Sequence, residues 1–343
     1  GSPNCTLNTW SGLIRPSRRL PTRTAWLRPS TTSGVGASGR CAAATCPDRF
    51  AGSIAFDMTL TRTRVRDLLD RHDIRPKRSL GQNFVVEPNT VRRIAELAGV
   101  GPGDRVVEIG PGVGSLTLAL AETGASVTAV EVDDVLVGVL AEVLADFGAG
   151  RDVRIVHADA MGVDWNEVLA SGESGGEHWA LVANLPYNIS VPLVCDLLED
   201  VPAIDRMVVM VQREVAERLV AGPGDDAYGL PSIKVAYHAE SRMVGRVPPS
   251  VFLPRPNVDS ALVKVVRRQR PAVDADPDRL FALVRAGFGQ RRKMLRRSLA
   301  GLLDEAAIEA AGVDPTDRAE QLGLEQWAAL VGETTPSPPG EAS

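Results

Sequence analysis

The chain contains 343 residues, of which 44% are hydrophobic and 24% charged, and its formal net charge is −5 at pH 7. No apolar run approaches the roughly 20 residues that cross a bilayer, so the sequence excludes a transmembrane helix and predicts a soluble protein without a membrane partner. The length suits one large domain and a smaller one. The acidic balance argues against nucleic-acid binding only where basic residues are evenly spread, and here they are not.

The number and spacing of the cysteines indicate the redox environment in which the protein works. The sequence holds Cys5, Cys41, Cys46 and Cys195, with no CxxC pair and no Cys/His cluster. Neither a disulfide framework nor a zinc site is indicated, and we predict no metal. Cys195 stands alone in the body of the chain, as is typical of a small buried residue. A body without disulfides fits a reducing compartment, so we predict a cytoplasmic location.

Residues 1–57 differ in composition from the rest. They are rich in Ser, Thr, Arg, Pro and Gly, and no acid precedes Asp48. We expect a disordered extension, with Met58 opening a domain that covers residues 58–270. The same Arg/Ser-rich, acid-poor composition is also that of a transit peptide, and this alternative stays open.

The first helical spacing runs from Leu60 to Asp73, and Asn89 is expected to cap a second helix that ends at Ala98. Apolar strand-like runs then alternate with helical patterns such as Ser115–Glu122 and Val135–Phe147. This alternation predicts an α/β fold with a doubly wound, seven-stranded Rossmann-like sheet. The strand candidates are Arg105–Ile109, Ser126–Val130, Val153–His157, Trp179–Ala183, Met207–Val211, Arg242–Val247 and Ala261–Val266.

The last part of the chain has helical spacing only. Pro271–Pro277 resembles a linker, and we expect a small helical domain over residues 274–331 and a disordered tail over residues 332–343. A basic run without any acid lies in this region, which favours contacts to RNA phosphates over a merely solvated helix face. The candidate RNA-binding residues are Arg291, Arg292, Lys293, Arg296 and Arg297.

A nucleotide-type cofactor site is predicted where the first strand meets a helix. Arg105–Ile109 runs into Gly110–Gly114, a glycine turn that lets a ligand approach the free N–H groups of the following helix. About 20 residues later Glu131 ends the next strand, where a carboxylate accepts hydrogen bonds from ribose hydroxyls. The third glycine is one residue too early for a dinucleotide fingerprint. Asp159 follows the third strand and suits the exocyclic amine of adenine, so we predict S-adenosylmethionine.

The fourth strand leads into Asn184-Leu185-Pro186-Tyr187-Asn188. An adenine N6 is a poor nucleophile because its lone pair is delocalised into the ring. The side-chain oxygen of Asn184 and a main-chain carbonyl at Leu185 or Pro186 are suited to accept both N6–H bonds, which frees that lone pair. Tyr187 offers a flat face for an extruded base. At the carboxyl end of a strand in the cofactor's own sheet, an ordinary turn is the weaker interpretation.

At this point the motifs resemble the rRNA adenine N6-dimethyltransferase family, and within it the branch that acts on 16S rRNA. The similarity covers roughly residues 60–331. The matching segments are Leu80–Phe84, Glu108–Gly114, Asn184–Asn188, Phe252–Ser260 and Gln290–Leu295.

The resemblance implies a function and a set of site residues. Family members methylate two adjacent adenosines near the 3′ end of 16S rRNA in the immature small subunit, and a monomer is expected. Tyr187 and Phe252 would sandwich the adenine, and Val85 stands where family members usually carry Leu. The implied cofactor-binding residues are Gln82, Asn83, Val85, Gly110, Gly112, Glu131, Val132, Asp159, Ala160 and Asn184.

Three rival interpretations remain open. The 23S rRNA methyltransferases of the macrolide-resistance type share fold and chemistry, although the Leu of Asn-Leu-Pro-Tyr-Asn and the Gln-Arg-Arg-Lys run favour the 16S type. A non-catalytic rRNA-binding assembly factor should show decay at Glu131, Asp159 or Asn184, and all three are intact. A DNA adenine methyltransferase would usually begin the catalytic motif with Asp.

Overall fold

The computed structural model describes residues 59–77, 80–170 and 178–333. The contacts of the chain divide Gly1–Ile54 from Ala55–Ser343, and the described residues all belong to the second unit. The extension expected over residues 1–57 and all but the first two residues of the expected tail lie outside these ranges. Within them, no helix is both long enough and apolar enough to span a membrane.

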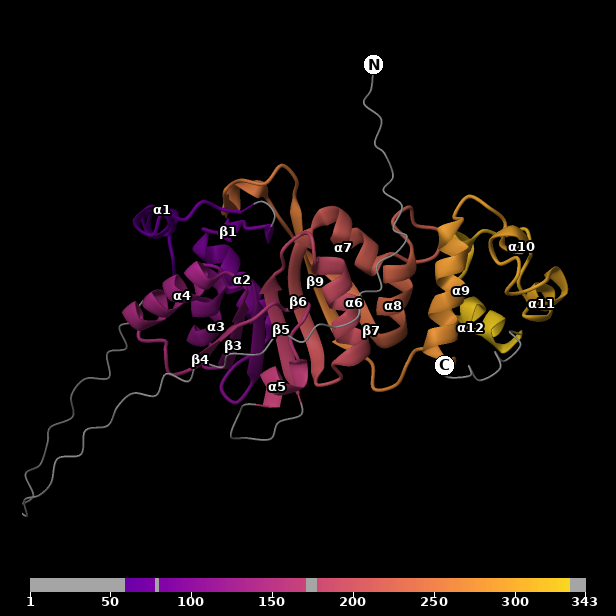
Figure 1. The fold of residues 1–343 in the computed structure, drawn as a ribbon, viewed down its shortest axis with the longest axis horizontal. Coiled ribbons are helices and arrows are strands. Elements are labelled where there is room, and N and C mark those ends of the chain that lie inside the picture. Colours follow the sequence, from indigo (N-terminus) through magenta and orange to yellow (C-terminus); the bar gives the residue numbers. More distant parts are fainter. Residues whose placement is uncertain (1–58, 78–79, 171–177, 334–343) are drawn as a thin grey trace, which may run out of the picture. The chain divides into compact units, whose positions relative to one another are not determined.

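A seven-stranded sheet forms the centre of the described fold (Figure 1), in the order β4-β3-β2-β5-β6-β9-β7. Neighbouring strands from β4 to β6 are parallel, and β9 runs antiparallel to both β6 and β7. This confirms the α/β prediction. The strands are β2 (Arg105–Ile109), β3 (Ser126–Glu131), β4 (Val153–His157), β5 (Trp179–Asn184), β6 (Ile204–Gln212), β7 (Ala239–Val247) and β9 (Ser260–Arg267).

The predicted strands coincide with the observed ones, and β2 and β4 agree to the residue. The starts of β6 and β7 are the exceptions, since each begins three residues before its predicted start. Asp205 and Arg206 follow the first residue of β6, and Glu240 and Ser241 follow the first residue of β7. Polar residues at these strand starts interrupt the apolar pattern on which the prediction relied.

Alternate residues of each strand face opposite layers of helices. Val106 belongs to one buried cluster with helix residues such as Leu118, whereas its neighbour Val107 belongs to another with residues such as Leu193. Helices α1–α4 therefore cover one face and α5–α8 the other, as the period of two in a strand requires. Their bounds are α1 (Arg62–Arg71), α2 (Pro88–Ala98), α3 (Ser115–Glu122), α4 (Asp134–Asp146), α5 (Trp165–Ala170), α6 (Ser190–Asp200), α7 (Arg213–Val220) and α8 (Leu230–His238).

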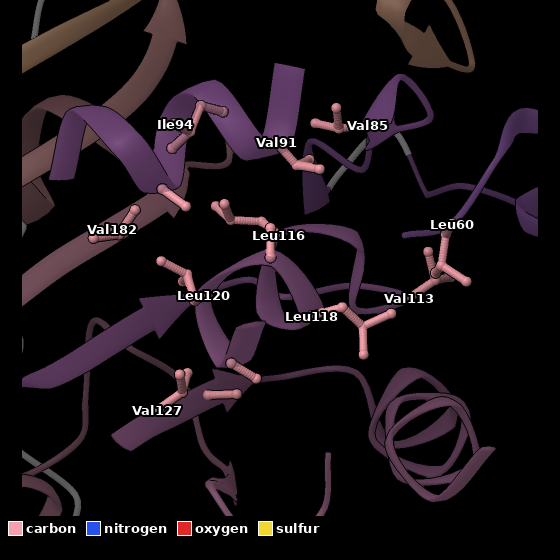
Figure 2. Packing of buried hydrophobic residues seen from close by; sticks show 14 of the residues in the cluster. Leu60, Val85, Val91, Ile94, Val113, Leu116, Leu118, Leu120, Val127 and Val182 are labelled. Carbon is pink, nitrogen blue, oxygen red and sulfur yellow. The ribbon is translucent and has the colours of Figure 1, made fainter. Parts of the chain in front are cut away.

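Figure 2 shows the first of these clusters. Leu116 and Leu120 of α3 extend toward Val91 and Ile94 of α2, and Val182 of β5 lies at the edge of the same group. This packing fixes α3, and with it the glycine turn that precedes α3, against the rest of the domain.

The predicted N-cap of α2 is wrong. Asn89 does not cap α2, which begins one residue earlier at Pro88 with Glu87 at the N-cap position. Proline is favoured at the first helical position because its missing N–H has no helical partner there in any case. Asn89 is therefore already inside the first turn.

A two-stranded sheet outside the main one joins two distant motifs. β1 (Phe84–Val85) pairs antiparallel with β8 (Phe252–Leu253), with Val85 opposite Phe252. The 3-10 helix η2 (Pro249–Val251) leads directly into β8. The pairing places the N-terminal motif, Leu80–Phe84, next to the glycine turn that follows β2.

Helices alone follow β9, as predicted. They bury a third cluster, which also holds Tyr228, Ile233 and Tyr237 from in and beside α8. Tyr237 packs edge-on against Phe281 with ring centroids 5.4 Å apart. The helical region thus shares apolar surface with α8, which packs on the main sheet. Its elements are α9 (Pro277–Gly289), α10 (Leu295–Ser298), α11 (Glu305–Ala310), η3 (Ala319–Gln321) and α12 (Leu324–Glu333).

Candidate functional site

A pocket lies at the carboxyl ends of the parallel strands, where β2 has β3 on one side and β5 on the other. The strand order reverses at this point, which is where open α/β sheets bind ligands. The pocket opens to solvent, and the space within it amounts to about 800 Å³ when the solvent-filled opening is included. Nearly all residues implied for the cofactor and the reaction line it: Gln82, Asn83, Val85, Gly110, Gly112, Glu131, Val132, Asp159, Ala160, Asn184 and Pro186.

In the turn between β2 and α3, glycine is required both by the backbone conformation and by the lack of room for a side chain. Gly110, Gly112 and Gly114 have φ angles of 68°, 58° and 92°, which L side chains rarely adopt. A Cβ on Gly112 would lie 2.9 Å from the Phe84 ring, and one on Gly114 would lie 2.7 Å from Leu140. The predicted turn is thus present, and α3 begins directly after it at Ser115.

Glu131, at the end of β3, is a buried carboxylate held by three main-chain N–H groups. Gly112 donates to Oε2 at 3.1 Å, and Val132 and Asp133 each donate to Oε1 at 3.0 Å. Burial raises the pKa of Glu131, and these bonds oppose that rise. A carboxylate offers about four acceptor positions. One further donor can therefore be accepted without loss of an existing bond.

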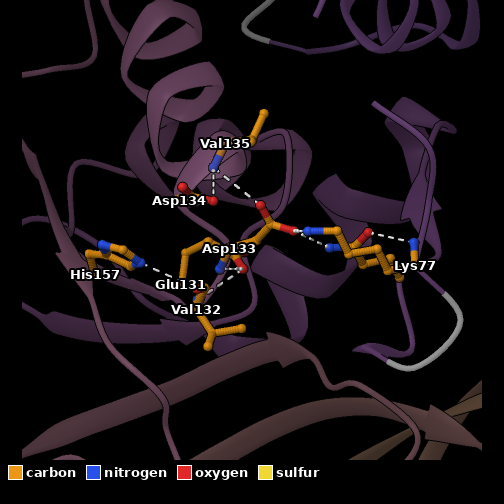
Figure 3. A network of polar contacts seen from close by, with 8 residues as sticks. Lys77, Glu131, Val132, Asp133, Asp134, Val135 and His157 are labelled. Atoms are coloured by element: carbon orange, nitrogen blue, oxygen red, sulfur yellow. Dashed lines mark hydrogen bonds and ion pairs between the residues drawn. The ribbon is translucent and has the colours of Figure 1, made fainter. Parts of the chain in front are cut away.

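A polar network beside Glu131 ties the N-terminal motif to the loop after β3 (Figure 3). Lys77 Nζ lies 2.7 Å from Asp133 Oδ2, and Gln82 Nε2 donates to the same oxygen at 3.2 Å. The other end of the Gln82 amide accepts from the main-chain N of Lys77 at 2.8 Å. Asp133 Oδ1 accepts from the main-chain N of Val135 at the start of α4. Gln82 therefore lines the pocket with its amide already engaged on both sides.

Asp159 occupies the third strand end, after β4, and is exposed. Its Oδ1 accepts from the main-chain N of Met161 at 3.0 Å. His157, an exposed residue that Figure 3 also shows, lies with Nε2 3.2 Å from the carbonyl of Val132. His157 is thus the last residue of β4, as in the predicted strand Val153–His157.

Sequence reasoning gave no role to Glu108, which lines the pocket from within β2. Its side chain is 2% exposed, and Oε2 has no hydrogen-bond partner among the residues that the structure describes. Burial raises the pKa of Glu108 to about 8, and the nearby charge of Glu131 adds to the rise. At neutral pH the group is therefore mainly a neutral acid. The sequence signal that could have pointed to Glu108 is an acidic residue within the otherwise apolar run Val106–Ile109.

Asn184 ends β5 and faces the pocket. Its side-chain Nδ2 donates to the main-chain carbonyl of Asn83 at 3.0 Å. Leu185 is buried, and its main-chain N donates to the carbonyl of Met210 at 3.0 Å. The carbonyl of Pro186 accepts from the main-chain N of Ile189 at 3.2 Å. Of the two carbonyls considered for the amine, this leaves that of Leu185 as the better candidate.

The two aromatic residues expected to hold the base do not line this pocket. Tyr187 is half-buried, and its hydroxyl lies 3.1 Å from Ser260 Oγ. Phe252 is fully buried in the apolar cluster beside α2 and α3. Stacking of a base on Phe252 requires that this side chain become uncovered, so its role stays a prediction.

The residues of the basic run differ in whether they already contact other residues of the chain. Arg291 donates from Nε to Glu320 Oε2 at 2.6 Å and from Nη2 to the carbonyl of Asp226 at 2.8 Å. These bonds connect the helical region with the loop before α8, so Arg291 already has a structural role. Arg296 lies 3.8 Å from Glu305. The remaining candidates, Arg292, Lys293 and Arg297, are exposed.

Within the described ranges no group of three or more His, Cys, Asp or Glu residues is arranged to hold a metal ion. The buried acid after β3, the glycine turn after β2 and the amide after β5 instead share one pocket. Together with the strand order, they define a Rossmann-like methyltransferase. A family model described as ribosomal RNA adenine dimethylase matches residues 74–335. The chain belongs to this family, whose members are S-adenosylmethionine-dependent methyltransferases.

Curated relatives agree with this assignment. The protein named ribosomal RNA small subunit methyltransferase A of Kineococcus radiotolerans is 49% identical over 283 residues, which cover 81% of this chain and 92% of that protein. The protein of the same name from Cutibacterium acnes is 48% identical over 284 residues, which cover 79% and 93%. The family resemblance predicted from the motifs is confirmed.

Two solved structures are similar as well. The 23S rRNA methyltransferase ErmE has a TM-score of 0.56 and 27% identity, and the match covers 74% of this chain and 99% of that chain. A dimethyladenosine transferase from Plasmodium falciparum has a TM-score of 0.61 and 23% identity, with coverage of 73% and 96%. The latter likeness concerns the fold alone.

Proposed function

We propose that the protein transfers methyl groups from S-adenosylmethionine to N6 of two adjacent adenosines near the 3′ end of 16S rRNA, giving N6,N6-dimethyladenosine. The substrate would be the immature small ribosomal subunit, and the protein would act as a cytoplasmic monomer. The observation that carries the proposal is the position of Asn184. Its amide lies in the same pocket as Glu131 and the glycine turn, so a methyl donor and a target amine can meet there.

The pocket suits a nucleoside cofactor. Glu131 has one acceptor position left for a ribose hydroxyl, and Asp159 has an oxygen left for an exocyclic amine. Val132 is 47% exposed at the pocket and offers an apolar surface for a flat base. Among the described residues that line the pocket there is no Lys or Arg to pair with a pyrophosphate. When bound, S-adenosylmethionine supplies an electrophilic methyl group.

The chain's own residues act by positioning. Asn184 Oδ1 and the carbonyl of Leu185 accept the two N6–H bonds of the adenine, which localises the lone pair on N6. Pro186 holds Leu185 in an extended conformation, so that the carbonyl of Leu185 faces outward. Tyr187 stacks on the base. No strong base is required, since the alkylated nitrogen loses its proton readily to water.

The helical region would hold the rRNA. We propose that Arg292, Lys293 and Arg297 contact phosphates, with a contribution from Arg296, whose ion pair is long. Such contacts orient the RNA without recognising its sequence. The region over residues 274–331 would then be an RNA-binding domain attached to a catalytic domain over residues 58–270.

The test is mass spectrometry of rRNA nucleosides after incubation of the protein with S-adenosylmethionine and unmethylated small subunits. We expect N6,N6-dimethyladenosine in 16S rRNA, and its absence would contradict the proposal. The similarity to ErmE makes 23S rRNA the second candidate substrate. Large subunits and free 23S rRNA therefore belong in the same experiment, and methylation confined to them would favour the 23S type. A non-catalytic assembly factor would methylate neither.

A further inference from the structure

The hydroxyl of Tyr187, just after β5, meets a serine of β9, which lies two strands away at the same edge of the sheet. Tyr187 Oη and Ser260 Oγ are 3.1 Å apart and share a hydrogen bond in which either hydroxyl can donate. The two residues are separated by 73 positions in the chain. The contact therefore depends on the fold and not on local sequence.

Ser260 is held by the main sheet. It is the first residue of β9, it is 0% exposed, and β9 runs between β6 and β7. Gln212 of β6 and Val247 of β7 are its partners in register. The preceding residue is fixed as well, because the carbonyl of Asp259 accepts from the main-chain N of Arg213 at 2.9 Å. The Ser260 hydroxyl is thus a rigid point.

Tyr187 is held at its main chain too. Its carbonyl accepts from Ser190 Oγ at 3.3 Å. Gly81 packs so closely against it that a Cβ there would lie 3.0 Å from the main-chain N of Tyr187. With the main chain fixed, the ring still turns about two side-chain torsions. The bond to Ser260 at the far end of the ring restricts both.

We propose that Ser260 is a positioning residue, which fixes the ring plane of Tyr187 so that the target adenine stacks on it in the orientation that Asn184 requires. The inference rests on the proposed function. Methyl transfer demands close alignment of the attacking atom, so a ring free to tilt would lower the rate more than it lowers binding. Burial raises the pKa of the Tyr187 hydroxyl, which suits a stacking surface and not a proton carrier.

The same chain segment would then serve both aromatic residues. Phe252 opens the segment in β8, and Ser260 closes it in β9. The motif Phe252–Ser260 thereby contributes one predicted stacking ring and tethers the other. The proposed role therefore accounts for the presence of Ser260 in the same motif as Phe252.

The experiment compares Ser260→Ala, Tyr187→Phe and the double variant with wild-type protein. Both single variants remove the same hydrogen bond and keep the ring. Ser241→Ala is the matched control, because Ser241 lies on the neighbouring strand β7 and its hydroxyl donates to the carbonyl of Leu219 at 3.0 Å. We measure kcat and KM for unmethylated small subunits, and the affinity for S-adenosylmethionine by calorimetry.

We expect kcat to fall about tenfold in each single variant, with little further loss in the double variant, since one bond is removed in all three. In the single and double variants, the affinity for S-adenosylmethionine and the thermal midpoint should equal those of the control Ser241→Ala. Wild-type kcat in Ser260→Ala, or losses that multiply in the double variant, would overturn the inference. If the wild-type protein methylates neither subunit, it is the proposed function that fails.

A second readout needs neither cofactor nor RNA. The chain has three tyrosines, so ring-labelled tyrosine gives a simple carbon NMR spectrum in which Tyr187 is assigned by its loss in Tyr187→Phe. Ser260→Ala should shift the Tyr187 ring signal, whereas Ser241→Ala should leave it in place. An unchanged Tyr187 signal in Ser260→Ala would show that the tether does not exist in solution.

Discussion

The side-chain amide of Asn184 donates a hydrogen bond to the main-chain carbonyl of Asn83, with Nδ2 and the carbonyl oxygen 3.0 Å apart. Only the NH₂ end of an amide can donate, so this bond determines which end of Asn184 is turned to Asn83. The oxygen Oδ1 is left as an acceptor for the target amine. The N-terminal motif thus helps to orient the group on which the reaction depends, in addition to lining the cofactor site.

The network around Asp133 predicts a route to weaker cofactor binding. Lys77→Met and Asp133→Asn each remove the ion pair that ties the N-terminal motif to the loop after β3. Asp133 accepts a hydrogen bond from Gln82 through its carboxylate and donates one to Glu131 through its main-chain N. Both contacts weaken when the ion pair is lost, so we expect the Kd for S-adenosylmethionine to rise about fivefold in each variant. Calorimetry on the free protein measures this.

The control for this prediction is Arg71→Met. It breaks the ion pair between Arg71 and Glu142, which has the same 2.7 Å separation but lies outside the pocket. Cofactor affinity should be unchanged in this variant. Equal effects of Arg71→Met and Lys77→Met would mean that the network acts on general stability alone.

Glu108 predicts a pH-dependent stability. Its pKa is about 8 in the folded chain against an ordinary value of 4.5, so the folded state holds a proton that the unfolded state releases. The contribution of Glu108 is most favourable below pH 4.5 and declines as the pH rises to about 8, by a few kcal/mol in total. Glu108→Gln stays neutral and lacks this decline.

The measurement is the free energy of unfolding of both proteins between pH 5 and pH 8.5. We expect the difference, Glu108→Gln minus wild type, to grow in favour of the variant as the pH rises. Parallel curves would show that Glu108 is ionised in the fold. Glu96→Gln, a substitution on the solvent side of α2, should leave the curve of the wild type unchanged.

The basic run predicts two separable phenotypes. Neutralising Arg292, Lys293 and Arg297 should weaken rRNA binding and reduce the salt slope by roughly 0.7–0.9 for each lost phosphate contact, without destabilising the fold. Arg291→Ala should lower the thermal midpoint instead, because it releases Glu320 and the carbonyl of Asp226. Binding isotherms across a salt series, paired with thermal melts, separate the two effects. An unchanged slope in the triple variant would remove these residues from the RNA interface.

The sheet could be predicted from sequence because its strands are apolar on both faces and are bounded by glycines and charged turns. The run Val106-Val107 before Gly110 is one example, since neighbouring residues serve opposite helix layers. Glu131, Asp159 and Asn184 could be predicted in the same way, because the ends of parallel strands meet at one edge. Gln82, Asn83 and Val85 came from the family resemblance instead.

What the sequence could not predict depends on partners that are distant in the chain. The two residues of β1 have no periodicity of their own, and only β8 makes them a strand. Arg291 belongs to a basic run by composition, yet its contacts come from Asp226 and Glu320. The start of α2 was misplaced because a side-chain cap was expected where Pro88 had already begun the helix.

The most direct test of the account is a single-turnover methyl-transfer measurement on Asn184→Ala with unmethylated small subunits. Asn166→Ala, an exposed residue on α5, is the control. We predict that Asn184→Ala binds S-adenosylmethionine within about threefold of the wild-type Kd and forms no detectable N6-methylated adenosine, whereas Asn166→Ala reacts normally. Transfer by Asn184→Ala at the wild-type rate would contradict the claim that this amide holds the target amine.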